Sequence, residues 1–110
     1  MDNLEEGQWE KVQLIDKPSY SCPDILLAEL YGRRLCIGNI GEEWFGFSPV
    51  CPHAGGELVE GELDKKGNVL CPIHGYTFNI KTGVNTSGEG YYLMHWPVKK
   101  REDGFYLKVG

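Results

Sequence analysis

Two short segments of the chain each offer one cysteine and one histidine, which are residue types that bind soft and borderline metal ions. Residues 51–53 read Cys-Pro-His and residues 71–74 read Cys-Pro-Ile-His. The interval 54–70 between them is long enough for a strand, a turn and a second strand, which would return the second segment beside the first. We therefore expect both segments to bind one shared metal centre.

Each of the two segments contains a mixture of the two ligand types. Zinc fingers normally take a cysteine pair from one knuckle and a histidine pair from the other. A mixed pattern suits an asymmetric two-iron, two-sulfur cluster, in which two cysteines hold one iron and two histidines hold the other. The candidate ligands are Cys51, His53, Cys71 and His74. A structural zinc site is an alternative interpretation of the same residues.

The neighbouring prolines and glycines fit this role. Pro52 and Pro72 stiffen the two segments, and Gly55, Gly56 and Gly75 let the backbone come close to a cluster, so that N–H groups can point at sulfur. Neutral imidazoles also remove two negative charges relative to an all-cysteine cluster. That exchange raises the reduction potential by at least roughly 250 mV, which is ~6 kcal/mol for one electron.

Short strands and tight turns are expected to position these segments. The 15 glycines and 6 prolines separate short runs of β-branched and aromatic residues, and no sustained 3.6-residue apolar period is present. We predict a mostly β fold whose antiparallel sheets pack as a sandwich or partial barrel. The predicted strands are 9–15, 25–30, 34–40, 44–48, 68–71, 77–79, 91–97 and 105–109. The predicted turns are 31–33, 39–42, 64–67, 81–83 and 102–104. Residues 24–30 could instead form a helical turn, because Leu and Ala are weak strand formers.

Length and charge limit the function further. At 110 residues the chain is expected to form one domain, residues 1–110. Sixteen acidic residues against 11 basic ones give a net charge of −5, which opposes binding to nucleic acids and anionic membranes. No apolar run has the length of a membrane span, and residues 1–6 contain neither a basic region nor an apolar run. We therefore expect a soluble cytoplasmic protein in which Cys22 and Cys36 are reduced thiols.

Residues 51–56 (Cys-Pro-His-Ala-Gly-Gly) and 71–78 (Cys-Pro-Ile-His-Gly-Tyr-Thr-Phe) together resemble the Rieske ferredoxin family. Residues 78–83 (Phe-Asn-Ile-Lys-Thr-Gly) are similar to the stretch that follows the second ligand loop in that family. The resemblance implies a Rieske-like antiparallel β-sandwich with a small cluster-binding subdomain at about residues 45–85. It also implies one 2Fe-2S cluster per chain, with the four candidate ligands above.

The chain departs from the cytochrome bc branch of that family at four positions. In that branch each ligand loop carries a further cysteine, and the two form a disulfide, whereas this chain has Gly56 and Ile73 at those places. That branch also places a serine and a tyrosine after the second loop, whose hydroxyls donate hydrogen bonds toward sulfur. Here those positions are Tyr76 and Phe78. Because a phenylalanine cannot donate and Tyr76 is too long to replace a serine hydroxyl, we expect a reduction potential at the low end of the family range.

The remaining residues favour an electron carrier over an enzyme. A terminal oxygenase needs a mononuclear iron held by two histidines and a carboxylate, but only His95 remains after the cluster is formed, and it is expected to be a structural strand residue. The chain also lacks a nucleotide-binding glycine motif. We expect a soluble monomer that carries one electron from a flavin-dependent reductase to a terminal oxygenase. The alternative is a non-catalytic small subunit of an NADH-dependent nitrite reductase-like complex.

Acidic residues in the insert between the two ligand segments provide a possible docking surface. Glu57, Glu60, Glu62 and Asp64 could form a rim that attracts a basic partner protein, or they could be only the solvated face of a hairpin. The aromatic residues Trp44, Phe45 and Phe47, which precede the first segment, are expected to form the core beneath the cluster.

Overall fold

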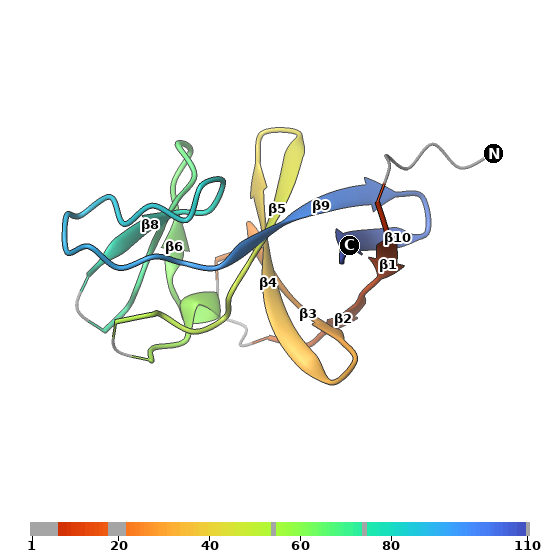
Figure 1. Ribbon diagram of the computed structural model, residues 1–110, viewed down its shortest axis with the longest axis horizontal. Helices are drawn as coiled ribbons and strands as arrows, with labels where there is room; N and C mark the ends of the chain where they lie inside the picture. Colours follow the sequence, from red (N-terminus) through yellow and green to blue (C-terminus); the bar gives the residue numbers. More distant parts are fainter. Residues whose placement is uncertain (1–6, 18–21, 54, 74, 110) are drawn as a thin grey trace.

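The computed structural model describes residues 7–17, 22–53, 55–73 and 75–109, and it consists mainly of antiparallel β-structure, as predicted. Two sheets lie at opposite ends of the molecule (Figure 1). The large sheet contains β1 (Trp9–Lys11), β2 (Gln13–Ile15), β3 (Ile25–Leu30), β4 (Arg33–Ile40), β5 (Glu43–Phe47), β9 (His95–Arg101) and β10 (Gly104–Lys108). The small sheet contains β6 (Glu62–Leu63), β7 (Asn68–Leu70) and β8 (Thr77–Asn79), preceded by a 3₁₀ turn, η1 (Leu58–Glu60). No helix within these ranges has the length and apolar character that crossing a membrane requires.

The large sheet is nearly closed, because one stretch of chain joins both of its edges. The strand order is β1-β10-β9-β5-β4-β3-β2. The single strand predicted for residues 9–15 is divided at Val12, so that β1 pairs with β10 and β2 pairs with β3. The Val12 N–H donates to the Phe105 carbonyl at 2.9 Å, which holds the crossing point in place. Closure leaves few unpaired strand edges.

Most of the predicted strands agree with the structure to within two residues, but the strand predicted at 91–97 was wrong in position. β9 begins only at His95, whereas Leu93 is buried against the small sheet and donates its N–H to Gly83 at 2.9 Å. Residues 91–94 therefore form a largely exposed segment that only Leu93 anchors in the core, and the strand begins after it. The helical alternative for residues 24–30 was also wrong. β3 pairs with a strand on each side, and this pairing outweighs the weak strand preference of Leu and Ala.

Strand β4 supplies side chains to two separate cores on its two faces. Leu35 and Ile37 point into the core of the large sheet, and Cys36 points into the core beneath the ligand segments. The next residue on that second face is Gly38, where a Cβ atom would lie 2.5 Å from Ile80 Cδ1. The glycine therefore allows the small sheet to pack closely on β4.

The aromatic residues of β5 are shared between the two cores. Phe47 is fully buried beneath the ligand segments, and Phe45 packs against the same core, as expected. Trp44 lies instead on the opposite face, 4.8 Å from Phe105 between ring centroids. The expectation that all three residues lie beneath the cluster was therefore wrong for Trp44, because alternate strand residues face opposite sides.

The hairpin between β6 and β7 is stabilised by the Asp64 carboxylate. Its Oδ1 atom accepts the N–H groups of Lys66 and Asn68, both at 2.9 Å. These hydrogen bonds, that of the Asn68 amide above all, hold the pKa of Asp64 below its usual value. The predicted turn at 64–67 is confirmed, and Gly67 in it has a φ of +93°.

We expect Asp64→Asn to destabilise the protein at neutral pH and to lose that effect in acid. Because folding lowers the pKa of Asp64, its stabilising contribution is complete above the unfolded pKa, about 3.9, and disappears as the pH falls through the lower folded value. Thermal unfolding of the wild-type and Asp64→Asn proteins from pH 7 to pH 3 measures the difference in their stability. A loss of bound metal in acid that affects both proteins equally cancels in this difference. A difference that is constant over this range would contradict the prediction.

Candidate metal centre

The two ligand segments form loops that share the same backbone hydrogen bonds and a glycine of positive φ at the same position. The first ligand loop, 51–56, follows β5, and the second ligand loop, 71–76, joins β7 to β8. In each loop the cysteine N–H donates to the carbonyl five residues later at 2.8 Å, and the cysteine carbonyl accepts the glycine N–H four residues later at 3.0 Å. Those glycines, Gly55 and Gly75, have φ values of +71° and +76°, which disfavour any residue with a side chain. The two loops therefore present their cysteines in the same way.

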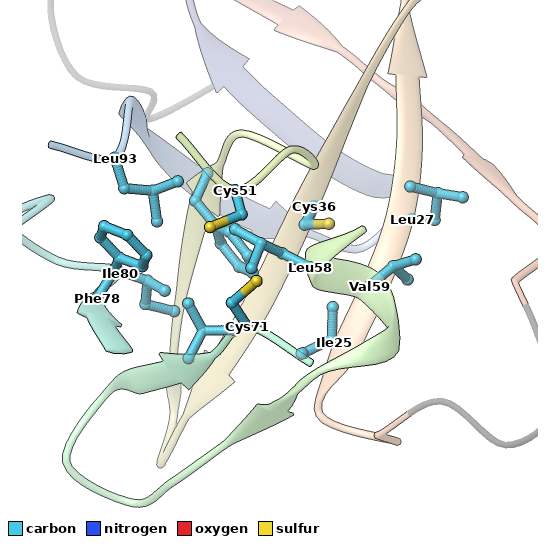
Figure 2. Close-up of a cluster of buried hydrophobic side chains, with 12 residues drawn as sticks. Ile25, Leu27, Cys36, Cys51, Leu58, Val59, Cys71, Phe78, Ile80 and Leu93 are labelled. Atoms are coloured by element: carbon cyan, nitrogen blue, oxygen red, sulfur yellow. The ribbon is translucent and has the colours of Figure 1, made fainter. Parts of the chain in front are cut away.

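Both ligand-loop cysteines are buried in one apolar core. Cys51 and Cys71 are each 1% exposed, and Figure 2 shows them among the side chains of Leu58, Phe78 and Ile80. An isolated thiolate in such surroundings would be unstable, because burying an uncompensated charge is costly. If both cysteines are ionised as metal ligands, cations must compensate their charge, and iron bridged by sulfide is a soft partner that suits them.

His53 lies beside this core on the first ligand loop. Its ring is half-buried and its Nδ1 atom is buried, so a metal bound there would be shielded from solvent. His74, the fourth predicted ligand, lies outside the described residues, and its role stays a prediction. The described part of the chain contains no group of three or more His, Cys, Asp and Glu side chains that could hold a single metal ion. In a binuclear cluster of the predicted type, each iron takes only two protein ligands.

The two ligand loops touch at the positions where a disulfide would link them. A Cβ atom on Gly56 would lie 2.5 Å from Ile73 Cγ1 and 3.2 Å from the Cys71 sulfur. The Ile73 side chain thus packs where the first extra cysteine would stand. All four cysteines of the chain, each of them within the described ranges, are free thiols. With Gly56 and Ile73 at this contact, no disulfide can link the two loops.

The two positions that stand where the cytochrome bc branch has its serine and tyrosine donors differ in their surroundings. Phe78 is fully buried and has no donor. Tyr76 stacks on the His53 ring, with centroids 4.1 Å apart and planes 24° apart. Desolvation raises the pKa of the Tyr76 phenol, and the nearby charges of Glu89 and Tyr91 add to the effect. The phenol is therefore neutral at physiological pH.

The other two cysteines are not part of the metal centre. Cys36 is fully buried on β4, and burial raises the pKa of its thiol to about 12, so that it stays protonated. Cys22 is half-buried and packs against the same core. Both are reduced thiols, as expected from the sequence.

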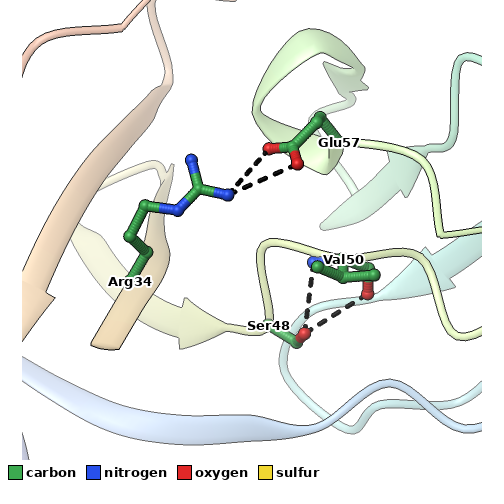
Figure 3. Close-up of polar contacts among 4 residues, drawn as sticks. All are labelled: Arg34, Ser48, Val50 and Glu57. Atoms are coloured by element: carbon green, nitrogen blue, oxygen red, sulfur yellow. Dashed lines mark hydrogen bonds and ion pairs between the residues drawn. The ribbon is translucent and has the colours of Figure 1, made fainter. Parts of the chain in front are cut away.

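The acidic insert between the ligand loops is only partly available to a partner. Glu57 forms an ion pair with Arg34, whose Nη2 atom lies 3.3 Å from both carboxylate oxygens (Figure 3). Asp64 stabilises its own turn. Of the four acidic residues, Glu60 and Glu62 take part in neither of these contacts, and both are exposed. Any docking rim is therefore smaller than the sequence indicated.

A third loop at the metal centre was missed by the sequence analysis, which placed Tyr91 in a strand. Residues 85–91 lie beside the ligand loops, and the Tyr91 ring is 5.2 Å from the His53 ring. The signal that could have located it is the segment Ser-Gly-Glu-Gly at 87–90, a composition typical of loops. His95 lies at the start of β9 and its Nε2 atom is 3.0 Å from the Tyr92 hydroxyl, which confirms it as a strand residue.

Comparison with known proteins shows which family this chain resembles. A model of the Rieske [2Fe-2S] domain matches residues 1–90. Apoptosis-inducing factor 3 of Homo sapiens is 32% identical over 108 residues, which are 97% of this chain and 15% of that protein. The ferredoxin subunit of 3-phenylpropionate/cinnamic acid dioxygenase from Escherichia coli (strain K12) is 30% identical over 70 residues, which are 58% of this chain and 66% of that subunit.

The chain is much shorter than some of its relatives, since it spans only 13–16% of the length of three of them. Among solved structures, a chain in the complex of reduced oxygenase and oxidized ferredoxin of carbazole 1,9a-dioxygenase has a similar fold. The TM-score is 0.71 with 26% sequence identity, over 91% of this chain and 92% of that one. The fold predicted from the resemblance is confirmed.

Proposed function

The chain belongs to the Rieske [2Fe-2S] domain family, and we propose that it works as a one-electron carrier between a flavin-dependent reductase and a terminal oxygenase. The observation that carries the proposal is the pair of equivalent loops, which bring Cys51 and Cys71 into one buried core beside His53. The family's cofactor is a 2Fe-2S cluster, one per domain, which supplies a one-electron redox centre. In this proposal Cys51 and Cys71 hold one iron, and His53 and His74 hold the other.

A carrier role is better supported than a catalytic one. The ferredoxin subunit of an aromatic acid dioxygenase and a chain in an oxygenase–ferredoxin complex are both similar to this chain. The nitrite reductase-like alternative describes an assembly module that often lacks the ligands, whereas Cys51, His53 and Cys71 are intact and lie together here. The zinc alternative is inconsistent with the family's cofactor.

The proposal extends to the state of the protein in the cell. A monomer in the cytoplasm suits a shuttle that must reach two partners in turn, and the reducing cytoplasm suits the free thiols of Cys22 and Cys36. We further propose that residues 1–110 form a single domain, with a cluster-binding subdomain at about residues 45–85. Electrons would enter and leave at the His53 side, because the cysteine side is covered by the apolar core.

Electron transfer between purified proteins tests this function. The anaerobically purified protein is mixed with NADH, a flavin-dependent reductase from an aromatic-ring dioxygenase system, and cytochrome c as the final acceptor. We expect cytochrome c reduction to increase in proportion to the concentration of this chain. A protein that contains its cluster and is reduced by dithionite, yet never accelerates this reaction or turnover of any oxygenase, would contradict the proposal.

The same assay tests whether the acidic insert attracts the reductase. Glu60→Lys combined with Glu62→Lys should slow stopped-flow reduction by about tenfold at low ionic strength, because a steering field is reversed, and less at high salt. The matched control is Glu42→Lys with Glu102→Lys, which makes the same charge change on exposed turns of the large sheet. Equal rates for the two double variants would show that the insert is only a solvated hairpin.

A further inference from the structure

Two tyrosines from different loops contact the same histidine. Tyr76, at the end of the second ligand loop, is stacked on the His53 ring at 4.1 Å. Tyr91, on the third loop, lies against that ring at 5.2 Å with the planes tilted by 56°. The two tyrosine rings are 6.0 Å apart, so the three rings form one group. We call Tyr76 and Tyr91 the aromatic clamp.

The third loop is held firmly enough to position Tyr91. The Asn85 side chain donates to the Thr77 carbonyl at 2.9 Å and accepts the Gly90 N–H at 2.7 Å. The Ser87 hydroxyl accepts the Thr77 N–H at 2.9 Å. Asn85 and Ser87 thus join the loop to strand β8, which begins directly after the second ligand loop, and the Gly90 bond closes the loop onto Asn85. Tyr91 therefore reaches His53 from a loop that is anchored to the same element as Tyr76.

We propose that Tyr76 and Tyr91 are positioning residues that fix the orientation of the His53 ring and make the metal centre harder to reduce. This inference rests on the proposed function, in which His53 is a ligand. Reduction adds one negative charge, and the clamp covers the ligand with rings where water would otherwise stabilise that charge. The faces of aromatic rings are themselves negative, so they disfavour the added charge further.

The surroundings of the clamp act in the same direction. Glu89, on the third loop between the two tyrosines in sequence, is close enough for its charge to act on both Tyr76 and His53. Its carboxylate accepts hydrogen bonds from Ser87 and Asn85, which lower its pKa and fix its position on the third loop. The Glu89 anion and the two aromatic rings therefore all oppose an additional electron at His53.

Leucine and phenylalanine variants separate the effect of the rings from that of the hydroxyls. Tyr76→Leu and Tyr91→Leu remove a ring, whereas Tyr76→Phe and Tyr91→Phe keep it. For each protein we would measure iron and sulfide content, the midpoint potential, and the EPR g values, which report the orientation of the ligand rings. Tyr92→Leu is the matched control, because Tyr92 is 59% exposed and contacts His95 instead.

With full iron content, each leucine variant should favour reduction by about two- to tenfold in the equilibrium constant, with altered g values. The phenylalanine variants and Tyr92→Leu should match wild type. Leucine variants with wild-type potential and g values would overturn the inference. If both leucine variants fail to load iron, the phenylalanine variants decide the question. A change in their midpoint potential would assign the effect to the tyrosine hydroxyls instead of the rings, and this result would also overturn the inference. A His53→Ala variant separates this result from a failure of the proposed function. If His53 is not a ligand, that variant retains the wild-type cluster.

Discussion

Replacing Cys71 by serine is expected to abolish the visible chromophore and the bound iron and sulfide, which the family's cofactor sets at two of each per chain. A serine hydroxyl is a hard, weakly acidic ligand that cannot replace a buried thiolate on iron. Cys51→Ser should have the same effect, because the two cysteines occupy equivalent positions in equivalent loops. Visible absorption with iron and acid-labile sulfide assays on anaerobically purified protein measures the loss.

The chain provides its own controls for this experiment. Cys36→Ala and Cys22→Ser change the number of cysteines in the same way but lie outside the ligand loops, so both variants should retain the chromophore. Cys36→Ala should still cost about 1 kcal/mol, as small deletions in a core do. Stoichiometric zinc without sulfide in the native protein, or a chromophore that survives in Cys71→Ser, would contradict the ligand assignment.

The ligand loops were predictable because their chemistry is local. Cysteine, proline and glycine at fixed short spacings determine the backbone path of such a loop, and both loops have the hydrogen bonds and positive φ values that this requires. The turn residues of the large sheet were predictable for the same reason. Gly32, Gly41 and Gly104 each have a positive φ at a predicted turn.

The features that were missed depend on contacts between distant parts of the chain. Val12 divides one apparent strand because residues on either side of it pair with opposite edges of the sheet. The ion pair between Arg34 and Glu57 joins residues 23 positions apart, so the sequence did not show that the Glu57 carboxylate is already paired within the chain. Tyr91 reaches His53 only because Asn85 and Ser87 bend the third loop back onto β8.

The midpoint potential of the native protein is expected near the lower limit of Rieske clusters, about −150 mV. The histidine ligands place the potential above the plant-type value of about −400 mV, and the hydrogen bonds to sulfur then set its position within the Rieske range. A hydrogen bond to a charged group is worth about 1.5–3 kcal/mol, or about 65–130 mV for one electron. The two donors that are absent at Tyr76 and Phe78 thus account for roughly half of the range from −150 to +300 mV.

The structure strengthens this expectation at both positions. Phe78 is fully buried in the core that contains both cysteines, so water cannot supply the missing donor from its side. Tyr76 directs its ring face at His53, and a stacked ring offers no hydroxyl to that ligand. A redox titration followed by EPR of the reduced protein measures the midpoint. A value above about +100 mV would mean that backbone N–H groups of the glycine-rich loops donate to sulfur strongly enough to replace both hydroxyls, and the argument from Tyr76 and Phe78 would then be wrong.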